Sequence, residues 1–325
     1  MILSPLHLHL IILPCFWFLL HMLSLPSSFT YNIKTVFSNG EAWLNALPSL
    51  IAECEERWSI KIGDPFKLSY NFVVPATRAD GSEVVLKLGV PNKEFASEIE
   101  ALRLCAGQGM VRMIEGDGER GILLMERVRP GIMLSELVTD DEQATLIAAQ
   151  VMRQMWRPVP AEYRPRLHSL QSWTQGIHEI RQRFAGGTGP YPAWLVENAE
   201  RIFAEQLASM EDEVLLHGDF HHDNVLSANP EATAWCIIDP KGLYGECSYD
   251  VGQFLLNPNL KLATDPAVQR RRIDILTAEL GLDKQRVTRW AAAHAVLSSW
   301  WDYNGIDDGW KGGAAVAEVL AGLIT

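Results

Sequence analysis

The stretch His217-Gly-Asp-Phe-His-His-Asp-Asn224, followed by Cys236-Ile-Ile-Asp-Pro-Lys-Gly242, decides the fold of this chain. Asp219 precedes Asn224 by five residues, and Asp239 ends an apolar run one short hairpin later. This order is typical of phosphoryl-transfer enzymes, in which the first Asp orients and deprotonates an acceptor hydroxyl. The Asn and the second Asp would hold Mg²⁺ on the nucleotide phosphates, because this ion prefers oxygen ligands. The pattern predicts a small-molecule kinase with Asp219 as base and Asn224 and Asp239 as metal ligands.

The histidines of this stretch allow a second interpretation, a zinc site. Gly218 interrupts the segment and its flanks read as short strands, so the histidines lie on a loop. No further Cys or His follows at metal-binding spacing. We expect His217 and His222 instead to support the loop through hydrogen bonds to its backbone. Asp250 is either a helix N-terminal acid or a buried support of the same backbone, and the two roles are compatible.

A lysine inside an apolar strand is the next signal. Lys87 lies in Glu83-Val-Val-Leu-Lys-Leu-Gly89, where a buried ammonium is costly unless it is paired. Kinases use such a lysine on the α- and β-phosphates and fix it with a Glu of the next helix. That helix is expected over 92–106, and Glu98 faces its apolar stripe. The alternative is that Lys87 is a surface residue of an edge strand.

The remaining nucleotide contacts are predicted from position. Strands are expected over 66–74 and 82–90, with a tight turn between them, and over 111–115 and 121–128. The loop with Ser69 and Asn71 lies where a phosphate-covering loop would lie, although it lacks the glycine-rich motif of protein kinases. The second hairpin runs into Arg129-Pro-Gly131, which resembles a linker between domains. Backbone groups of Glu126 and Val128 would meet the adenine edge there.

The second half of the chain reads as mostly helical. Helices are expected over 141–157, 171–184, 192–210, 266–280, 284–303 and 314–323. The fold class is therefore α+β: a bilobal, protein-kinase-like fold with an antiparallel sheet and one key helix in the N-terminal lobe, and a mostly helical C-terminal lobe. The expected parts are an apolar extension (1–21), a nucleotide-binding lobe (22–128) and a catalytic and substrate-binding lobe (129–325).

Composition limits the partners and the compartment. The net charge of −12 at pH 7 argues against a nucleic-acid partner, which would need a basic face. The five cysteines are scattered without a CxxC motif, which favours reduced core residues and a cytoplasmic location. The apolar run 6–25 allows three interpretations: a signal peptide, a membrane anchor, or a start of translation at Met22. We favour the third, so a membrane partner is not expected.

Five stretches together resemble the aminoglycoside/hydroxyurea antibiotic resistance kinases of the streptomycin 6-phosphotransferase type. They are Trp43–Pro48 with Glu56–Trp58, Val84–Gly89, Ala101–Leu104 with Gly107–Gly109, Leu215–Val225, and Ile238–Gly245. The HGDxHxxN core belongs to a wider phosphotransferase superfamily that includes choline and homoserine kinases, whereas the Asp-Pro-Lys-Gly continuation is a narrower signal. The resemblance runs from about residue 25 to the end of the chain. It implies ATP and Mg²⁺ as cofactors, Asp219 as base, Asn224 and Asp239 as metal ligands, and Lys87 with Glu98 on the phosphates.

The resemblance leaves the acceptor open. Streptomycin carries two guanidinium groups, so its kinase should present carboxylates and aromatic faces near the base. Glu246, Asp302 and Trp301 are the candidates; the alternative for them is ordinary helix packing and a solvated acidic turn. Two other functions remain: a kinase of a small endogenous alcohol such as a sugar, choline or amino-alcohol, and a nucleotide-binding module without catalysis. The intact set of catalytic residues speaks against the last.

Overall fold

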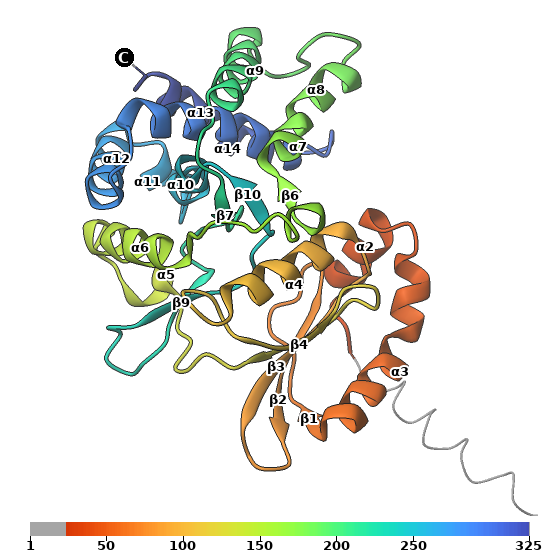
Figure 1. Ribbon diagram of the computed structural model, residues 1–325. Coiled ribbons are helices and arrows are strands. Elements are labelled where there is room, and N and C mark those ends of the chain that lie inside the picture. Colours follow the sequence, from red (N-terminus) through yellow and green to blue (C-terminus); the bar gives the residue numbers. More distant parts are fainter. Residues whose placement is uncertain (1–23, 325) are drawn as a thin grey trace, which may run out of the picture. The chain divides into compact units, whose positions relative to one another are not determined.

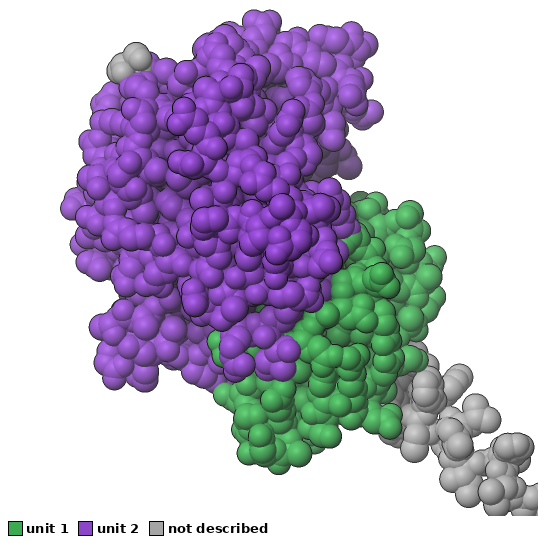
Figure 2. Space-filling view, in the orientation of Figure 1, with its two compact units in different colours: residues 1–92, 115–126 green, residues 93–114, 127–325 purple. Residues whose placement is uncertain are grey.

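The computed structural model describes residues 24–324, so the apolar extension over 1–21 and Met22 lie outside the described residues. The chain divides into two compact units, residues 1–92 with 115–126 and residues 93–114 with 127–325 (Figure 2). The division therefore differs from the expected boundary at 128, because helix α4 (Lys93–Cys105) groups with the second unit. Two contacts that are distant in sequence join α4 to the second unit: Ser97 Oγ donates to Lys241 O (2.7 Å), and Glu94 pairs with the Lys241 ammonium (2.8 Å).

A five-stranded sheet forms the centre of the first unit (Figure 1). Its order is β1 (Ile60–Ile62), β2 (Phe72–Arg78), β3 (Glu83–Leu88), β5 (Ile122–Glu126) and β4 (Met113–Asp117). The pairs β1–β2, β2–β3 and β3–β5 are antiparallel, as expected. The first predicted strand was placed too early, since β2 begins at Phe72 and continues to the turn. At that turn Asp80 accepts hydrogen bonds from the Ser82 amide and hydroxyl.

Among the described residues, the first unit also contains the helices α2 (Ser27–Val36) and α3 (Gly40–Trp58). Helix α3 buries Trp43, Leu47, Ile51 and Cys54, which recur every three or four residues and so share one face. The Trp43 ring meets Phe29 of α2 edge-on at 6.4 Å.

The second unit is mostly helical. Its long helices are α4, α6 (Asp141–Met155), α9 (Ala193–Ala208), α10 (Cys247–Leu255), α12 (Pro266–Leu280), α13 (Lys284–Trp301) and α14 (Trp310–Ala321). Short helices are α5 (Leu134–Leu137), α7 (Leu170–Thr174), α8 (His178–Arg183), α11 (Leu260–Ala263) and the 3-10 turns η1 (Arg164–Arg166) and η2 (Gln175–Ile177). Helix α13 packs against α9, α10 and α14 (Figure 1). It is buried along most of its length.

The predicted helix over 171–184 is confirmed as an unbroken helical run, in which α7, the 3-10 turn η2 and α8 follow one another without a gap. Gly176, in the 3-10 turn, lies close to α13: an added Cβ would come within 3.1 Å of Leu297 Cδ1 and 3.5 Å of Trp301 Nε1. Gln175, Gly176 and the start of α8 line a cavity described below.

Short strands interrupt these helices. The strands β8 (Val225–Ser227) and β9 (Trp235–Ile237) form an antiparallel hairpin. A second sheet has the order β6 (His168–Ser169), β10 (Leu243–Gly245), β7 (Val214–Leu216). The observed architecture is thus the predicted α+β fold, with an antiparallel N-terminal sheet and a mostly helical remainder. Among residues 24–324, no helix has the length and apolar character needed to cross a membrane.

Candidate active site

The loop that follows β7 carries Asp219, and the buried carboxylate of Asp250 holds its backbone. Asp250 Oδ2 accepts from the His217 amide (2.8 Å) and the Trp156 indole (3.1 Å), and Oδ1 accepts from the Gly218 amide (2.8 Å). Burial raises the pKa of Asp250 to about 6, although these hydrogen bonds oppose the shift. The structure shows both expected positions for this residue, in the first turn of α10 and against the loop backbone.

His217 closes the same loop from the inside. Its Nε2 lies 2.9 Å from Ile238 O, and its Nδ1 accepts from the Asp219 amide at 3.2 Å. Because a carbonyl can only accept, Nε2 carries the proton. Burial lowers the pKa of His217 to about 3, so the ring stays neutral and tied to the backbone, as expected of a support.

Asn224 and Asp239 lie at one end of the β8–β9 hairpin. Val225 pairs with Ile237, and the Ile238 amide donates to Asn224 O (3.0 Å), so the residues flanking the two strands are adjacent. Asn224 Nδ2 donates to Asp219 O (3.0 Å), which leaves its Oδ1 as the acceptor atom. Asp239 adopts a left-handed backbone conformation (φ 64°). An amide oxygen and a carboxylate suit Mg²⁺, so the residues present fit this ion.

His222 supports the loop differently from our expectation. It stacks on the Phe254 ring (4.2 Å, 12°), and neither ring nitrogen has a hydrogen-bond partner among the described residues. Burial lowers its pKa to about 3, so the ring is neutral and contributes packing against Phe254. The prediction of backbone hydrogen bonds for His222 was therefore wrong, because a loop histidine and a core histidine cannot be told apart in sequence.

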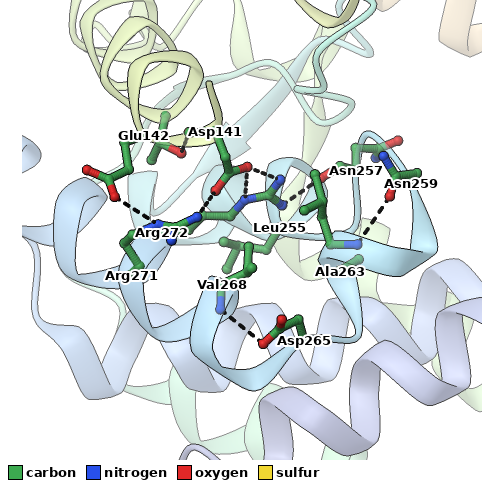
Figure 3. A network of polar contacts seen from close by, with 12 residues as sticks. Asp141, Glu142, Leu255, Asn257, Asn259, Ala263, Asp265, Val268, Arg271 and Arg272 are labelled. Atoms are coloured by element: carbon green, nitrogen blue, oxygen red, sulfur yellow. Dashed lines mark hydrogen bonds and ion pairs between the residues drawn. The ribbon is translucent and has the colours of Figure 1, made fainter. Parts of the chain in front are cut away.

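Phe254 is itself held by a fully buried arginine. Arg272 lies 5.4 Å from the Phe254 ring centre. Its guanidinium donates to Asp141 Oδ1 (2.9 Å) and Asn257 O (2.6 Å) (Figure 3). Burial raises the pKa of Asp141, but its pairing with Arg272 and Arg271 outweighs this and holds the pKa below its usual value. Helices α6 and α12 are thereby joined beneath the loop.

The carboxylate of Asp219 points toward three side chains. Gln253 Nε2 donates to Oδ1 (3.0 Å), Lys241 Nζ lies 3.8 Å from Oδ2, and His221 Nε2 lies 3.9 Å from Oδ1. Gln253 comes from α10, three residues after Asp250, and so lies on the same helical face. One helix therefore places both the backbone and the side chain of the loop.

The segment around Lys241 is fixed at three points. The Lys241 amide donates to His217 O (2.7 Å), its carbonyl accepts from Ser97 Oγ (2.7 Å), and its ammonium pairs with Glu94 (2.8 Å). Gly242 follows with φ 67°, and a Cβ there would lie 2.2 Å from Ser97 O, so only glycine fits. Burial lowers the pKa of Lys241, but the carboxylates of Glu94, Asp239 and Asp219 raise it above its ordinary value.

A cavity of about 870 Å³ opens beside these groups, lined by residues of the second unit alone. Its lining residues are Lys93, Glu94, His168, Ser172, Trp173, Gln175, Gly176, His178, Glu179, Gln182, Gly218, Asp219, Lys241, Gln253 and Trp301. Trp173 and Trp301 meet edge-on at 5.2 Å, and Glu179 accepts from the Trp300 indole (3.1 Å). Carboxylates and indole rings thus share one cavity with Asp219.

Of the predicted acceptor residues, only Trp301 lines this cavity. Glu246 does not line it; its carboxylate is buried and paired with the guanidinium of Arg286. Asp302, at the C-terminal end of α13, lies outside the lining as well. The prediction for Glu246 was therefore wrong, because Arg286 lies 40 residues further along the chain and its approach leaves no trace in the sequence around Glu246.

The predicted nucleotide residues are distributed over both units. Lys87 is buried on β3 of the first unit and Glu98 is buried on α4 of the second, so their pairing stays a prediction. Ser69 and Asn71 precede β2, with Ser69 O accepting from Asn32 Nδ2 (3.2 Å). Glu126 is the last residue of β5, and Val128 follows it.

Four residues near Asp219 were not predicted: Lys241, Glu94, Glu179 and Gln253. Lys241 stood within the decisive motif, but a lysine after Asp-Pro reads as solvated until the distant Glu94 is placed beside it. The signal for Gln253 was its position one helical turn after Asp250. Across residues 24–324, no group of three or more His, Cys, Asp or Glu side chains is arranged to hold a metal ion.

Comparison with known proteins gives a consistent result. Residues 57–305 match the family model described as aminoglycoside/hydroxyurea antibiotic resistance kinase. A streptomycin 6-kinase of Streptomyces griseus is 34% identical over 87% of this chain and 92% of its own length. A hydroxyurea phosphotransferase of Kitasatospora aureofaciens is 33% identical over 87% of this chain and 81% of its own.

Solved structures show the same fold. An aminoglycoside phosphotransferase in a ternary complex with ADP and hygromycin B matches with a TM-score of 0.56 and 13% sequence identity, over 84% of this chain and 98% of that chain. The likeness confirms the predicted fold class.

Proposed function

This chain belongs to the aminoglycoside/hydroxyurea antibiotic resistance kinase family, and on that premise we propose that it transfers the γ-phosphoryl group of ATP to a hydroxyl of a cationic aminoglycoside such as streptomycin. The observation that carries the proposal is the cavity beside Asp219, with its carboxylates and indole rings. Since the reaction consumes ATP, we keep the cytoplasm as the expected location.

The size of the cavity favours a large acceptor. Pockets for drug-sized ligands span roughly 300–1,000 Å³, and this one measures about 870 Å³. Hydroxyurea or choline would fill only a small part of that volume and would leave the reacting hydroxyl poorly fixed. An aminoglycoside of several rings would fill it.

The chemistry of the cavity favours a cation. Glu179 and the faces of Trp173 and Trp301 lie on its wall, and guanidinium groups bind both carboxylates and indole rings. Lys93 and Lys241 also line it, and the Lys241 ammonium is paired with the Glu94 carboxylate. We therefore assign the guanidinium groups of the acceptor to the wall formed by α7 and α8.

Asp219 acts as the general base. One carboxylate oxygen is held by Gln253, which leaves Oδ2 to accept the proton of a hydroxyl bound in the cavity. The Asn224 and His217 contacts fix the backbone on which the carboxylate is carried.

The nucleotide is assigned to the residues singled out in the sequence. An aminoglycoside phosphotransferase of the same fold was crystallised with ADP, which supports ATP as the donor here. Asn224 and Asp239 would hold Mg²⁺, which when bound neutralises charge on the transferring phosphoryl group. Lys87 with Glu98 would hold the phosphates, Ser69 and Asn71 would cover them, and the backbone of Glu126 and Val128 would meet the adenine.

Lys241 adds a cation on the acceptor side. Its ammonium lies 3.8 Å from Asp219 Oδ2, and its backbone is fixed by hydrogen bonds to His217 and Ser97. A phosphoryl group passing from ATP to the acceptor must approach Asp219 and therefore this ammonium. Lys241 stabilises the charge that spreads over the phosphoryl oxygens.

The proposal is tested by incubating the purified protein with Mg-ATP and streptomycin, hydroxyurea, choline or neutral polyols, and following phosphorylated product by mass spectrometry. We expect streptomycin to have the highest kcat/KM. Hydroxyurea is the second candidate, because its phosphotransferase is as similar to this chain as the streptomycin kinase is. Preference for hydroxyurea or a neutral polyol would reject the aminoglycoside assignment.

The acceptor wall is tested by Glu179→Gln, which keeps the shape and the acceptor for Trp300. We expect KM for streptomycin to rise about two- to fivefold, the effect of an exposed charge pair, with KM for ATP unchanged. Glu197→Gln is the matched control, because this glutamate is exposed and lies outside the cavity lining. Equal effects of the two substitutions would remove Glu179 from the site.

A further inference from the structure

A chain of hydrogen bonds leads from the helical core of the second unit to Asp219. Tyr249 OH lies 2.8 Å from His294 Nδ1, and His294 Nε2 lies 2.8 Å from Gln253 Oε1. Gln253 Nε2 in turn donates to Asp219 Oδ1 at 3.0 Å. Tyr249 and Gln253 lie on α10, and His294 lies on α13.

The donor and acceptor of every hydrogen bond in this series follow from its last member, the Asp219 carboxylate. A carboxylate only accepts, so the amide group of Gln253 must face Asp219 with its NH₂. The Gln253 carbonyl then faces His294, which must donate from Nε2. A neutral imidazole has one donor and one acceptor, so Nδ1 accepts and the Tyr249 hydroxyl donates to it.

Burial keeps Tyr249 and His294, two members of this series of hydrogen bonds, in this one arrangement. Tyr249 and His294 are each 1% exposed, so water does not compete for their polar atoms. Burial also lowers the pKa of His294 to about 4, which keeps the ring neutral at physiological pH. The Tyr249 ring is fixed edge-on against Trp290 (5.5 Å) and against His294 (5.1 Å).

Gly252 lets α10 and α13 approach closely enough for His294 to reach both Tyr249 and Gln253. A Cβ at this position would lie 3.2 Å from both Cβ and Cδ2 of His294, closer than nearly all such contacts. The segment Tyr249-Asp-Val-Gly-Gln253 thus supplies the first and third members of the chain and the space for the second. Asp250, within it, fixes the backbone of the same loop.

We infer that Tyr249, His294 and Gln253 are positioning residues that lock the Asp219 carboxylate in one orientation, with Oδ1 occupied and Oδ2 presented to the acceptor hydroxyl. This inference rests on the proposed role of Asp219 as base. The alternative is that the hydrogen bond between Tyr249 and His294 only stabilises the core and has no effect on Asp219.

The kinetic test compares two tyrosines. Tyr249→Phe removes the first donor of the chain, and we expect kcat to fall about three- to tenfold, the loss of one neutral hydrogen bond. Tyr191→Phe is the matched control, because Tyr191 is also buried and its hydroxyl donates to Ser299 O (3.0 Å) on α13 without any link to Asp219. Both variants should lose similar stability, but only Tyr249→Phe should lose kcat.

Gln253→Leu removes the bond to the carboxylate itself. A hydrogen bond to a charged group is worth more, so we expect kcat to fall about ten- to hundredfold, with KM for ATP unchanged. Gln253→Asn, which keeps the amide on a shorter side chain, should recover only part of the loss. Unchanged kcat in both Tyr249→Phe and Gln253→Leu, with both proteins folded, overturns the inference.

The tautomer of His294 gives a readout that needs no acceptor. The ¹⁵N shifts of the imidazole should show a protonated Nε2 and a bare Nδ1 in the unmodified protein, and Gln253→Leu should relax that preference. A protonated Nδ1 overturns the inference whatever the kinetics show. Failure of the proposed function looks different: Asp219→Asn would keep its turnover while His294 still showed the expected tautomer.

Discussion

At the scale of single residues, Lys241 and Asp219 form the centre of the site. The ammonium of Lys241 is paired with Glu94 and stands beside the Asp219 carboxylate, while its amide and carbonyl are both hydrogen-bonded. The pair with Glu94 holds a long, flexible side chain, which loses about 2 kcal/mol of rotamer entropy when it is held. Fixation at this entropic cost is consistent with a role in charge stabilisation.

Lys241→Met keeps much of the side-chain volume and removes the charge. We expect kcat to fall about a hundred- to thousandfold, as for loss of one preorganised donor, with Mg-ATP binding retained. The measurement is steady-state kinetics alongside thermal stabilisation by Mg-ATP. Lys93→Met is the control, since Lys93 lines the same cavity without contacting Asp219 in any pair described above. A kcat equal to that of the control would exclude the role.

Sequence reasoning reached the residues whose spacing is fixed by local structure. Asp219, Asn224 and Asp239 stand on a loop and a hairpin, so five and fifteen residues of separation already place them together. Lys241, Glu94 and Gln253 could not be placed in this way. Lys241 lies 147 residues from its partner Glu94, and Gln253 lies 34 residues from its partner Asp219, so only tertiary packing brings them to the site.

At the scale of elements, α10 and the α6–α12 pair support the loop that carries Asp219. Helix α10 supplies Asp250 and Gln253, whose position one turn apart was visible in the sequence. The buried Arg272–Asp141 pair under Phe254 could not be predicted from the sequence, because neither residue belongs to an apolar pattern that predicts burial. The tightening of the helix to a 3-10 turn at Gln175–Ile177 was not predicted either, because the close approach of Gly176 to α13 is a tertiary contact.

Arg272→Met should destabilise the second unit by about 3–5 kcal/mol, because Asp141 would be left as a largely buried charge without its main partner. Arg271→Met is the matched control: Arg271 also pairs with Asp141 but its side chain is 41% exposed, so its loss should cost at most about 1 kcal/mol. Urea unfolding measures both. Adding Asp141→Asn to Arg272→Met should recover part of the loss; equal costs for the two arginines would contradict the assignment.

At the scale of the whole molecule, several buried histidines make stability depend on pH. The pKa values of His217 and His222 are lowered to about 3 and that of His294 to about 4, each by burial. Below the unfolded value of about 6.5, the unfolded chain binds protons that the folded chain does not. Stability is therefore full above that pH and is lost as pH falls. Asp250 has the opposite effect on stability. Burial raises its pKa to about 6, so the folded chain binds its proton before the unfolded chain does, and this contribution to stability grows as pH falls.

For these four groups the unfolded chain binds about two protons more than the folded chain near pH 5, which corresponds to a loss of about 2.7 kcal/mol per pH unit. Urea midpoints measured from pH 8 to pH 4.5 should be flat at first and then fall steeply below about pH 6. His222→Leu should make the fall shallower by about one proton, since this ring stacks on Phe254 and has no hydrogen bond to lose. A flat profile down to pH 5 would contradict the neutral, buried state of these rings.

The central claim is that Asp219 deprotonates an acceptor hydroxyl in the cavity of the second unit. The most direct measurement is single-turnover phosphoryl transfer from Mg-ATP to the best acceptor of the screen, comparing the unmodified protein with Asp219→Asn. We predict that Asp219→Asn binds Mg-ATP normally, seen as unchanged thermal stabilisation, and transfers the phosphoryl group about a hundred- to ten-thousandfold more slowly. Transfer by Asp219→Asn at nearly the unmodified rate would contradict the claim.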